Sequence, residues 1–273
     1  MEFSRRRFLG VVGAAGCTCG LPHNAAHAQE VFSGEGFCAE LVSLEDSATE
    51  FAIEEFGENA LDPSQPPEAA AYKAKRWNPK RTSLKVGLLS QPNYVDRVIA
   101  SARKWEPYTG VSFDFVGDGE IDILVDFSPG GSWSYLGTDS KIYAKRGDRS
   151  MNFGWLKANS SDSEFDRVVI HEFGHALSLV HEHKRPDAKI DWNVKAVYDY
   201  YKKNYPQYDE KWVKNNVLDR YQSDVLNWTT PYDKKSIMHY AIPAALLMDP
   251  SGAVAWNTEL SQKDEEFAGW LFG

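Results

Sequence analysis

The chain has 273 residues, 13% of them aromatic, and its 39 acidic and 30 basic residues give a formal net charge of −9. This acidic balance argues against nucleic acid or an anionic membrane surface as a partner. The length suffices for one large domain or for two smaller lobes around a cleft. Beyond residue 28, no segment is long and apolar enough for stable insertion into a membrane.

Residues 1–28 have the pattern of a bacterial export signal. Arginines occupy residues 5–7, a mildly apolar run covers residues 10–16, and a small-x-small cleavage site follows at residues 26–28. The consecutive arginines favour a twin-arginine leader over a general secretory signal. We therefore expect this signal peptide to be removed and the protein to be exported, as a periplasmic or a secreted protein.

The cysteines limit the covalent cross-links of the exported chain. Cys17 and Cys19 leave with the leader. Cleavage before Cys17, as in a lipoprotein, is disfavoured because Ala14 stands where a larger aliphatic residue is usual. Only Cys38 then remains, so an internal disulfide cannot form and stability must come from the core.

Residues 29–76 are acidic and irregular, and the proline-rich stretch at residues 62–67 is typical of a linker. We interpret residues 29–76 as a pro-region or N-terminal extension that precedes the main domain at residues 77–273. The competing interpretation is that they belong to the folded domain and pack against it through apolar side chains between residues 51 and 56.

The first half of the main domain predicts a sheet with a helix packed across it. Apolar residues at helical spacing lie between residues 94 and 108. Strand patterns occur at residues 84–89, 111–116, 121–127 and 151–153. This order of elements indicates an α+β fold. The glycine-flanked aromatic segment at residues 130–137 predicts a loop and an edge strand.

Beyond residue 186 the sequence predicts helices and irregular segments. Stretches rich in Lys, Tyr and Asn predict helices at about residues 193–205 and 208–220. Ser261 and Asp264 form a cap-like start to a final helix.

The segment at residues 164–187 contains an H-E-x-x-H motif. His171 and His175 are four residues apart, so on a helix both imidazoles point at the same place. Glu172 is turned toward the cleft beside them, where it can take a proton from a water activated by a metal. His181 can join them only if the helix stops and the chain turns back. Three imidazoles and one open position are the ligand set of a catalytic zinc ion.

The distribution of histidine supports a metal site over a helix with ordinary core or surface histidines. Of the seven histidines, two lie in the leader, four lie between residues 171 and 183, and the last is His239. Such concentration in one place argues for metal binding.

A second motif is Ser236-Ile237-Met238-His239-Tyr240, in which Met238 lies 57 residues after His181. Together with the histidine motif it resembles the metzincin zinc peptidases, and more narrowly the astacin family. In that family Glu, Arg and Asp follow the third histidine, as Glu182, Arg185 and Asp187 do here. The resemblance covers roughly residues 77–273.

The resemblance implies a zinc-dependent endopeptidase with one catalytic Zn²⁺. It implies that the zinc ligands are His171, His175 and His181. Glu172 would be the general base, Met238 the apolar floor under the metal, and Tyr240 a ligand of the resting metal that swings away to stabilise the oxyanion. The alternative is an inactive zinc-binding protein that holds a peptide or glycan, but such a protein needs neither Glu172 nor Tyr240.

The fold implied by the resemblance has two lobes with a cleft between residues 77–181 and 182–273. A twisted mixed sheet with long helices forms the N-terminal lobe, and a mainly irregular and helical C-terminal lobe contains the Met-turn. A polypeptide substrate would lie extended along the edge strand at residues 132–136 and add a strand to the sheet.

Two departures from the family pattern affect the expected site. Ser178 replaces the glycine of the sharp turn after the second histidine, and a positive φ at a non-glycine residue costs about 1 kcal/mol. We expect this turn to be strained or differently made. Near the N-terminus, Glu35 lies in a loose match to the family's F-x-G-D activation motif, and Cys38 is an alternative blocking ligand for the zinc.

Overall fold

The computed structural model describes residues 38–41, 71–206, 208–227 and 230–273. The predicted leader, Glu35, the apolar side chains between residues 51 and 56, and the side chain of Cys38 lie outside the described part. The predictions made for them therefore stay predictions.

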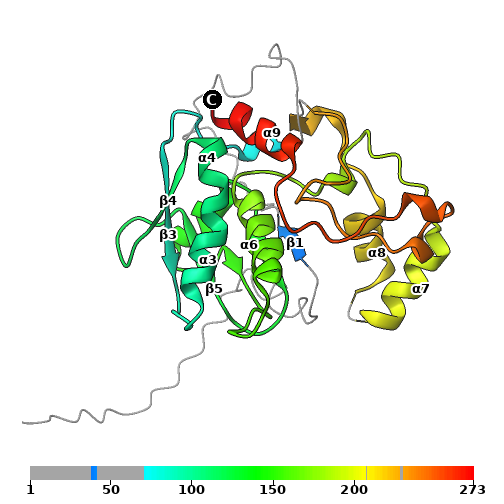
Figure 1. The fold of residues 1–273 in the computed structure, drawn as a ribbon, viewed down its shortest axis with the longest axis horizontal. Helices are drawn as coiled ribbons and strands as arrows, with labels where there is room; N and C mark the ends of the chain where they lie inside the picture. The colour runs from blue at the N-terminus through cyan, green and yellow to red at the C-terminus, as the bar shows by residue number, and fades with distance from the viewer. Residues whose placement is uncertain (1–37, 42–70, 207, 228–229) are drawn as a thin grey trace, which may run out of the picture. The chain divides into compact units, whose positions relative to one another are not determined.

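A six-stranded mixed sheet forms the frame of the first half of the molecule (Figure 1). Its strand order is β1-β6-β7-β5-β3-β4, and every pair is parallel except the antiparallel pair β6–β7. The strands are β1 (Cys38–Leu41), β3 (Ser83–Leu88), β4 (Ser112–Phe115), β5 (Ile123–Asp126), β6 (Ser132–Tyr135) and β7 (Met151–Asn152). The predicted strands are confirmed to within two residues at each end.

Helices α3 and α6 lie side by side in front of this sheet in Figure 1. The helical segments of this half are α3 (Val95–Ala102), the short 3-10 turn η3 (Arg103–Trp105), α4 (Glu106–Thr109), α5 (Asp139–Lys145) and α6 (Asp162–Ala176). The predicted helix across the sheet is confirmed, although 3-10 geometry interrupts it. Helix α5 was not predicted, because Asp, Ser and Lys occupy buried positions in it.

The core between α6 and its neighbours consists of aromatic rings and aliphatic side chains. Phe113 on β4 packs edge-to-face on Phe173 of α6, with 4.8 Å between ring centroids. The indole nitrogen of Trp105 donates a hydrogen bond of 2.9 Å to the carbonyl of Ile170. All four residues are buried, so burial together with these directional contacts fixes the position of α6 on the sheet.

Strand β6 is not the edge of the sheet, which corrects the prediction. Residues 38–41 of β1 pair with it in parallel register, so that Cys38 lies opposite Ser132 and Leu41 opposite Tyr135. Strand β6 is therefore second from the edge. The sequence CAEL has no alternation that would have predicted a strand there.

Among the described residues after residue 181, regular structure consists mainly of three helices. These are α7 (Val194–Asn204), α8 (Glu210–Val213), which continues as the π-helical turn η5 (Lys214–Leu218), and α9 (Gln262–Phe272). The predicted capping box is confirmed, because Ser261 accepts from the Asp264 backbone and the Asp264 side chain accepts from the Ser261 backbone. The α+β prediction and the mainly irregular and helical C-terminal part are thus confirmed.

The remaining elements of the described residues are short. A two-stranded antiparallel sheet joins β2 (Ala71–Tyr72) to β8 (Leu226–Asn227). Single 3-10 turns are η2 (Lys73–Lys75), η4 (Glu182–Lys184), η6 (Ser223–Val225), η7 (Ala244–Leu246) and η8 (Pro250–Gly252).

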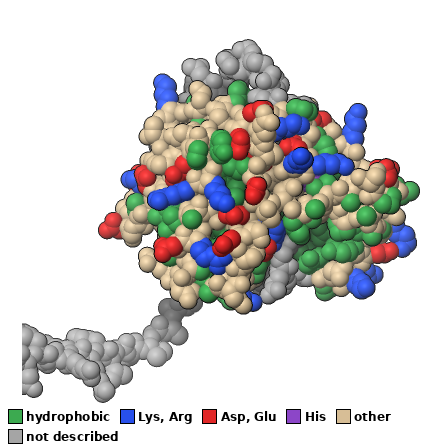
Figure 2. Space-filling model, in the orientation of Figure 1, with side chains coloured by type: hydrophobic (Ala, Val, Ile, Leu, Met, Phe, Trp, Pro, Cys, Tyr) green, Lys and Arg blue, Asp and Glu red, His purple; other side chains and the backbone are tan. Residues whose placement is uncertain are grey.

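The surface drawn in Figure 2 carries acidic and basic side chains intermixed, with apolar and aromatic side chains gathered near α7 and α8. There the rings of Tyr208 and Trp212 stack with 3.9 Å between centroids, and Tyr201 packs against Trp212. Among the described residues, no helix has the length and apolar character needed to cross a membrane.

Candidate active site

Helix α6 supplies the first three side chains of the site. Its N-terminus is fixed by Ser161, whose hydroxyl accepts a hydrogen bond of 3.1 Å from the backbone of Glu164. One helical turn separates His171 from His175, whose ring centroids lie 4.7 Å apart, and Glu172 lies between them in sequence. All three side chains are buried.

The chain turns back after α6 and brings a third histidine to the first two. The helix ends at Ala176, and Ser178 has a φ of 84°, as expected for the strained turn. As a result, the Nε2 atoms of His175 and His181 lie 3.2 Å apart. Ligand atoms of His171, His175 and His181 all lie within 4.8 Å of one another, so the three residues are positioned to bind one metal ion.

Backbone carbonyls determine which ring nitrogen of His171 and of His175 faces the point where the three histidines converge. Nδ1 of His171 lies 2.8 Å from the carbonyl of Ile237, and Nδ1 of His175 lies 2.8 Å from that of Leu179. Because a carbonyl only accepts, both Nδ1 atoms must carry the proton, which leaves the Nε2 lone pairs for a metal.

Burial keeps the imidazoles of His171 and His181 neutral, as metal binding requires. Desolvation lowers the pKa values of His171 and His181 well below the ordinary value, and the neighbouring histidines lower them further. Within the described part of the chain, the buried Nε2 of His171 finds no hydrogen-bond partner. A neutral nitrogen donor without a partner fits a zinc ion.

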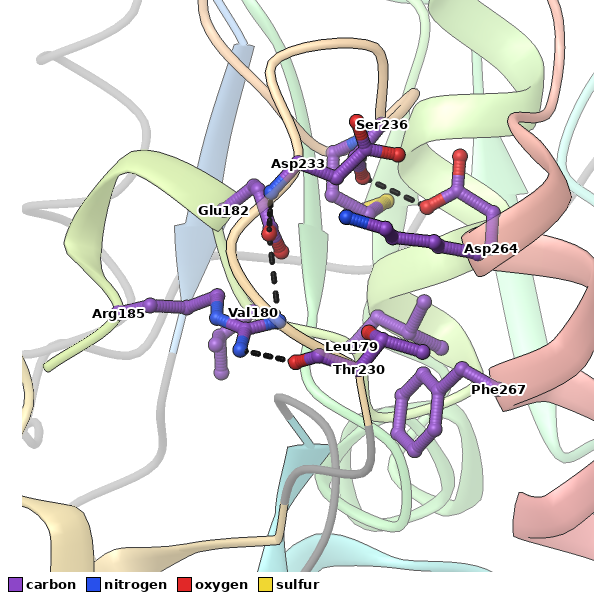
Figure 3. Close-up of a pocket in the computed structure, with 11 residues that line it drawn as sticks. Leu179, Val180, Glu182, Arg185, Thr230, Asp233, Ser236, Asp264 and Phe267 are labelled. Atoms are coloured by element: carbon purple, nitrogen blue, oxygen red, sulfur yellow. Dashed lines mark hydrogen bonds and ion pairs between the residues drawn. The ribbon is translucent and has the colours of Figure 1, made fainter. Parts of the chain in front are cut away.

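The Met-turn lies directly under α6. Met238 is buried, and a methyl group added at Gly174 of α6 would overlap with its sulfur atom, so only glycine permits this contact. The turn is held from below by Asp264 of α9 (Figure 3). This carboxylate accepts hydrogen bonds of 2.6 Å from the hydroxyl of Ser236 and 2.8 Å from the backbone of Ile237.

Asp264 therefore supports His171 through one intervening residue, Ile237. Sequence reasoning identified Asp264 only as a helix cap and missed this second role. The capping box does not indicate this second role, because the hydrogen bonds to Ser236 and Ile237 join residues 28 and 27 apart in sequence. Burial raises the pKa of Asp264 to about 6, although hydrogen bonds from Ser236 and Ser261 pull it down.

Tyr240 lies beside the three histidines. Its ring centroid is 4.2 Å from that of His181 and 6.2 Å from that of His171. On its other side the ring stacks on His183, with 4.6 Å between centroids. Sequence reasoning counted His183 as part of the histidine cluster but gave it no contact. The structure thus brings the three histidines and Tyr240 together with Met238 under α6, whereas Glu35 and the side chain of Cys38 lie outside its described part.

A buried ionic network links the third histidine to the chain before the Met-turn (Figure 3). Glu182 accepts a hydrogen bond of 2.8 Å from the backbone of Asp233. Arg185 donates to the carbonyl of Thr230 and forms ion pairs with Glu182 and Asp187. Burial raises the pKa of Glu182 to about 8, although Arg185 pulls it down. These contacts fix residues 230–233, the segment that leads into Ser236.

The arrangement of helix, returning third histidine and Met-turn defines the metzincin-like class of fold. The family model of the astacin peptidases matches residues 69–249, about two thirds of the chain. The chain therefore belongs to the astacin family, as the sequence motifs indicated.

Individual relatives agree with this assignment. The structure of myroilysin is similar with a TM-score of 0.70 and 38% identity, over 75% of this chain and 98% of that one. Zinc metalloproteinase nas-36 of Caenorhabditis briggsae is 27% identical over 177 residues, which are 62% of this chain and 24% of that protein. Bone morphogenetic protein 1 of Xenopus laevis is 32% identical over 146 residues, 51% of this chain and 17% of that protein. The chain thus spans about a quarter or less of these two relatives' length.

Proposed function

We propose that the protein is a zinc-dependent endopeptidase in which His171, His175 and His181 bind a single Zn²⁺. The observation that carries the proposal is the convergence of these three buried histidines within 4.8 Å in a chain of the astacin family. Zinc, when bound, supplies a Lewis acid that polarises the scissile carbonyl and acidifies a water molecule.

The remaining chemistry belongs to the side chains around the histidines. Glu172 is the general base: its carboxylate takes the proton of the attacking water and later delivers it to the leaving amine. Tyr240 donates its phenolic proton in a hydrogen bond to the oxygen that becomes negative in the transition state. The proximity of the Tyr240 ring to His181 supports this role.

A test of the proposal measures zinc content and casein hydrolysis of the purified protein, with and without a chelator. We expect about one zinc per chain and activity that the chelator removes and added zinc restores. Chelator-resistant hydrolysis would contradict the proposal. One bound zinc without any hydrolysis by the processed chain would instead favour the inactive peptide-binding or glycan-binding alternative.

We further propose that a polypeptide substrate takes the place of β1 along β6. An exposed strand edge adds a peptide by main-chain hydrogen bonds, and residues 38–41 occupy that edge of β6 in the structure. On this view the part of residues 29–76 that precedes residue 68 is a pro-region that keeps the enzyme latent, because Ala71 and Lys75 pack into the main domain. Glu35 or Cys38, tethered nearby, would block the metal at an effective concentration that can reach millimolar.

The contacts of the segment before residue 77 show how latency should be tested. Ala71 is buried and bridges Leu179, and Lys75 forms a buried ion pair with Asp139. A shortened chain should therefore begin at residue 68 and keep these contacts. We expect it to be more active than a chain that begins at residue 29, whereas equal activities of two folded chains would eliminate latency.

Chemical treatment distinguishes the two blocking ligands. A thiol-modifying reagent should activate the longer chain if Cys38 blocks the site, because the modified thiolate can no longer bind zinc. The reagent should have no effect if Glu35 blocks it. Activation by the reagent that persists after Cys38→Ser would contradict the cysteine assignment.

For residues 1–28 we propose export through a twin-arginine leader. Its consecutive arginines and its small-x-small site support the assignment. N-terminal sequencing of protein from the periplasm or medium should begin at Gln29 or later, and replacement of the arginine pair with lysines should retain the precursor inside the cell. Export of that variant at the normal level would favour the general secretory route.

A further inference from the structure

The turn between the second and third histidines contains an unusual backbone conformation. Among the described residues, Ser178 alone has a positive φ without being a glycine, and its side chain is fully buried. This left-handed conformation is unfavourable for an L-residue, because Cβ comes too close to the following carbonyl oxygen. Something in the surroundings must therefore hold the turn in this form.

The hydroxyl of Ser178 supplies one such contact. It donates a hydrogen bond of 2.7 Å to the carbonyl of Lys75, which also accepts one of 2.9 Å from the backbone of Thr138. Gly137 makes the close approach possible, because a methyl group at this residue would overlap with the Lys75 carbonyl and the Ser178 hydroxyl. The backbone of Gly137 also donates to the carbonyl of His175, at 2.9 Å.

The carbonyl that receives this bond is itself rigidly held. Nζ of Lys75 forms an ion pair of 2.8 Å with Asp139, and both side chains are buried. Two residues further, the indole nitrogen of Trp77 donates a 2.7 Å hydrogen bond to the carbonyl of Ala176 at the end of α6. The segment around Lys75 is thus fixed both to the start of α5 and to the end of α6.

We propose that Ser178 is a positioning residue for the metal site. The bond from its hydroxyl to Lys75 holds the left-handed turn, and the turn places His181 against His175. A glycine would adopt this φ without a partner, whereas serine is held there by its hydrogen bond. The inference rests on the proposed function in one respect, that these histidines bind zinc.

Two substitutions at this residue separate the hydrogen bond from the backbone strain. Ser178→Ala keeps the strain and removes the bond, so we expect zinc affinity, measured by competition with a chelator, to fall about tenfold. Ser178→Gly removes both and should weaken zinc binding less, because the looser turn still reaches the required φ. Zinc binding by Ser178→Ala as tight as in the wild type, or tighter binding by Ser178→Gly, would overturn the proposal.

A matched control distinguishes positioning from general stabilisation. Ser101 on α3 is also a buried serine, and its hydroxyl donates a 2.8 Å hydrogen bond to Asp166. Ser101→Ala should lower the Tm of the metal-free protein and leave zinc affinity unchanged. If Ser178→Ala behaves in the same way, Ser178 has only a structural role and the proposal fails.

A second variant tests whether the Lys75 segment, which accepts the hydrogen bond from Ser178, supports the turn. Asp139→Asn removes the charge that holds Lys75 without altering the turn itself, and zinc affinity should again fall several-fold. Unchanged affinity in this variant would show that the Lys75 segment does not position the histidines. Failure of the wild-type protein to bind zinc would count against the proposed function as a whole.

Discussion

The two halves of the candidate site are built in different ways. The helical half, residues 162–176, supplies His171, Glu172 and His175 from a single helix. The turn half, residues 177–240, supplies His181, Met238 and Tyr240 from a chain with almost no strand or helix near them. Backbone hydrogen bonds of α6 and its packing on the sheet orient the first half, whereas the second lacks a repeating backbone pattern.

The turn half is held instead by single bonds between side chains and backbone groups. Asp264 binds the Met-turn at Ser236 and Ile237, and Glu182 binds the backbone of Asp233. Arg185 binds the carbonyl of Thr230. Each charged group lies in a buried setting, where loss of one partner is costly. The geometry of the turn half therefore depends on residues that are neither proposed zinc ligands nor proposed catalytic groups.

The largest effect is expected from the helical half. Glu172→Ala should reduce casein hydrolysis by at least about a thousandfold, because the proton of the attacking water loses its acceptor. Zinc content and Tm should stay near those of the wild type. Glu164→Ala, on the same helix but paired with Arg167, serves as a matched control that should keep most activity. Hydrolysis by Glu172→Ala near the wild-type rate would refute the assigned role.

The second-largest effect tests whether His181, from the turn half, contributes as much to zinc affinity as the two histidines of α6. His181→Ala should weaken zinc binding by more than about a hundredfold, since even the outer partners of metal ligands are worth up to about that factor. The measurement is chelator competition monitored by zinc content. His239→Ala is the control, because this buried histidine donates to the backbone carbonyl of Tyr240 and accepts from the hydroxyl of Tyr232 instead. Unchanged zinc content in His181→Ala would remove it from the ligand set.

Tyr240→Phe should lower kcat about a hundredfold, as expected for the loss of one oxyanion donor. KM should remain nearly unchanged, because the ring and its contacts with His181 and His183 are kept. Tyr201→Phe, another buried tyrosine, is the control and should leave both constants unchanged. An effect of Tyr240→Phe on KM alone would mean that Tyr240 only shapes the site.

The same contrast explains what could be predicted from the sequence. Helix α6 was predictable because its apolar residues follow a helical period and its two histidines share a face. The strands were predictable from alternation. The spacing of His181 required a turn after α6 only on the condition that His181 is a ligand. The family resemblance, in which a glycine stands at the position of Ser178, predicted that this turn is strained or differently made. The roles of Met238 and Tyr240 came from the family resemblance, since no pattern in that stretch indicates them.

Three features could not be predicted, for physical reasons. The support of the Met-turn by Asp264 joins residues 27 and 28 apart through two hydrogen bonds, and such pairing leaves no periodic signal. The short strand β1 is defined by its pairing with β6 and has no strand pattern of its own. Helix α5 buries Asp139 and Lys141 through ion pairs, so its sequence lacks the apolar periodicity by which a buried helix is predicted.

The smallest effect on activity, and the sharpest test of the turn half, concerns Asp264. Asp264→Asn keeps the shape of the side chain but replaces one acceptor oxygen with a donor, which cannot accept from Ser236 or Ile237. We expect kcat to fall less than about tenfold, because the Met-turn still packs under α6. The variant should also change how stability depends on pH.

The sign of that change follows from burial. Asp264 has a pKa of about 6 in the folded protein, against an ordinary value of 3.8. The folded state therefore holds this proton more tightly, and the free energy of unfolding should fall by at most about 3 kcal/mol as the pH rises from about 4 to about 6. Other charged groups line the same cavity, namely Glu182, Arg185, Asp233 and Lys263.

Subtracting the curve of a variant removes the contribution of groups that titrate alike in both proteins, and leaves that of Asp264 together with Glu182, whose pKa the Asp264 charge raises. Urea unfolding from pH 4 to 7 should show a free energy of unfolding that depends less on pH for Asp264→Asn than for the wild type. The difference in free energy of unfolding between the two proteins should change mainly below pH 6. The exposed Asp118 gives the control, since Asp118→Asn should follow the wild-type curve. Parallel curves for Asp264→Asn and the wild type would show that Asp264 is ionised across this range. Hydrogen bonds from the Met-turn would then stabilise the ionised Asp264 carboxylate more than burial destabilises it. The carboxylate would hold the turn half more firmly than a pKa of about 6 suggests.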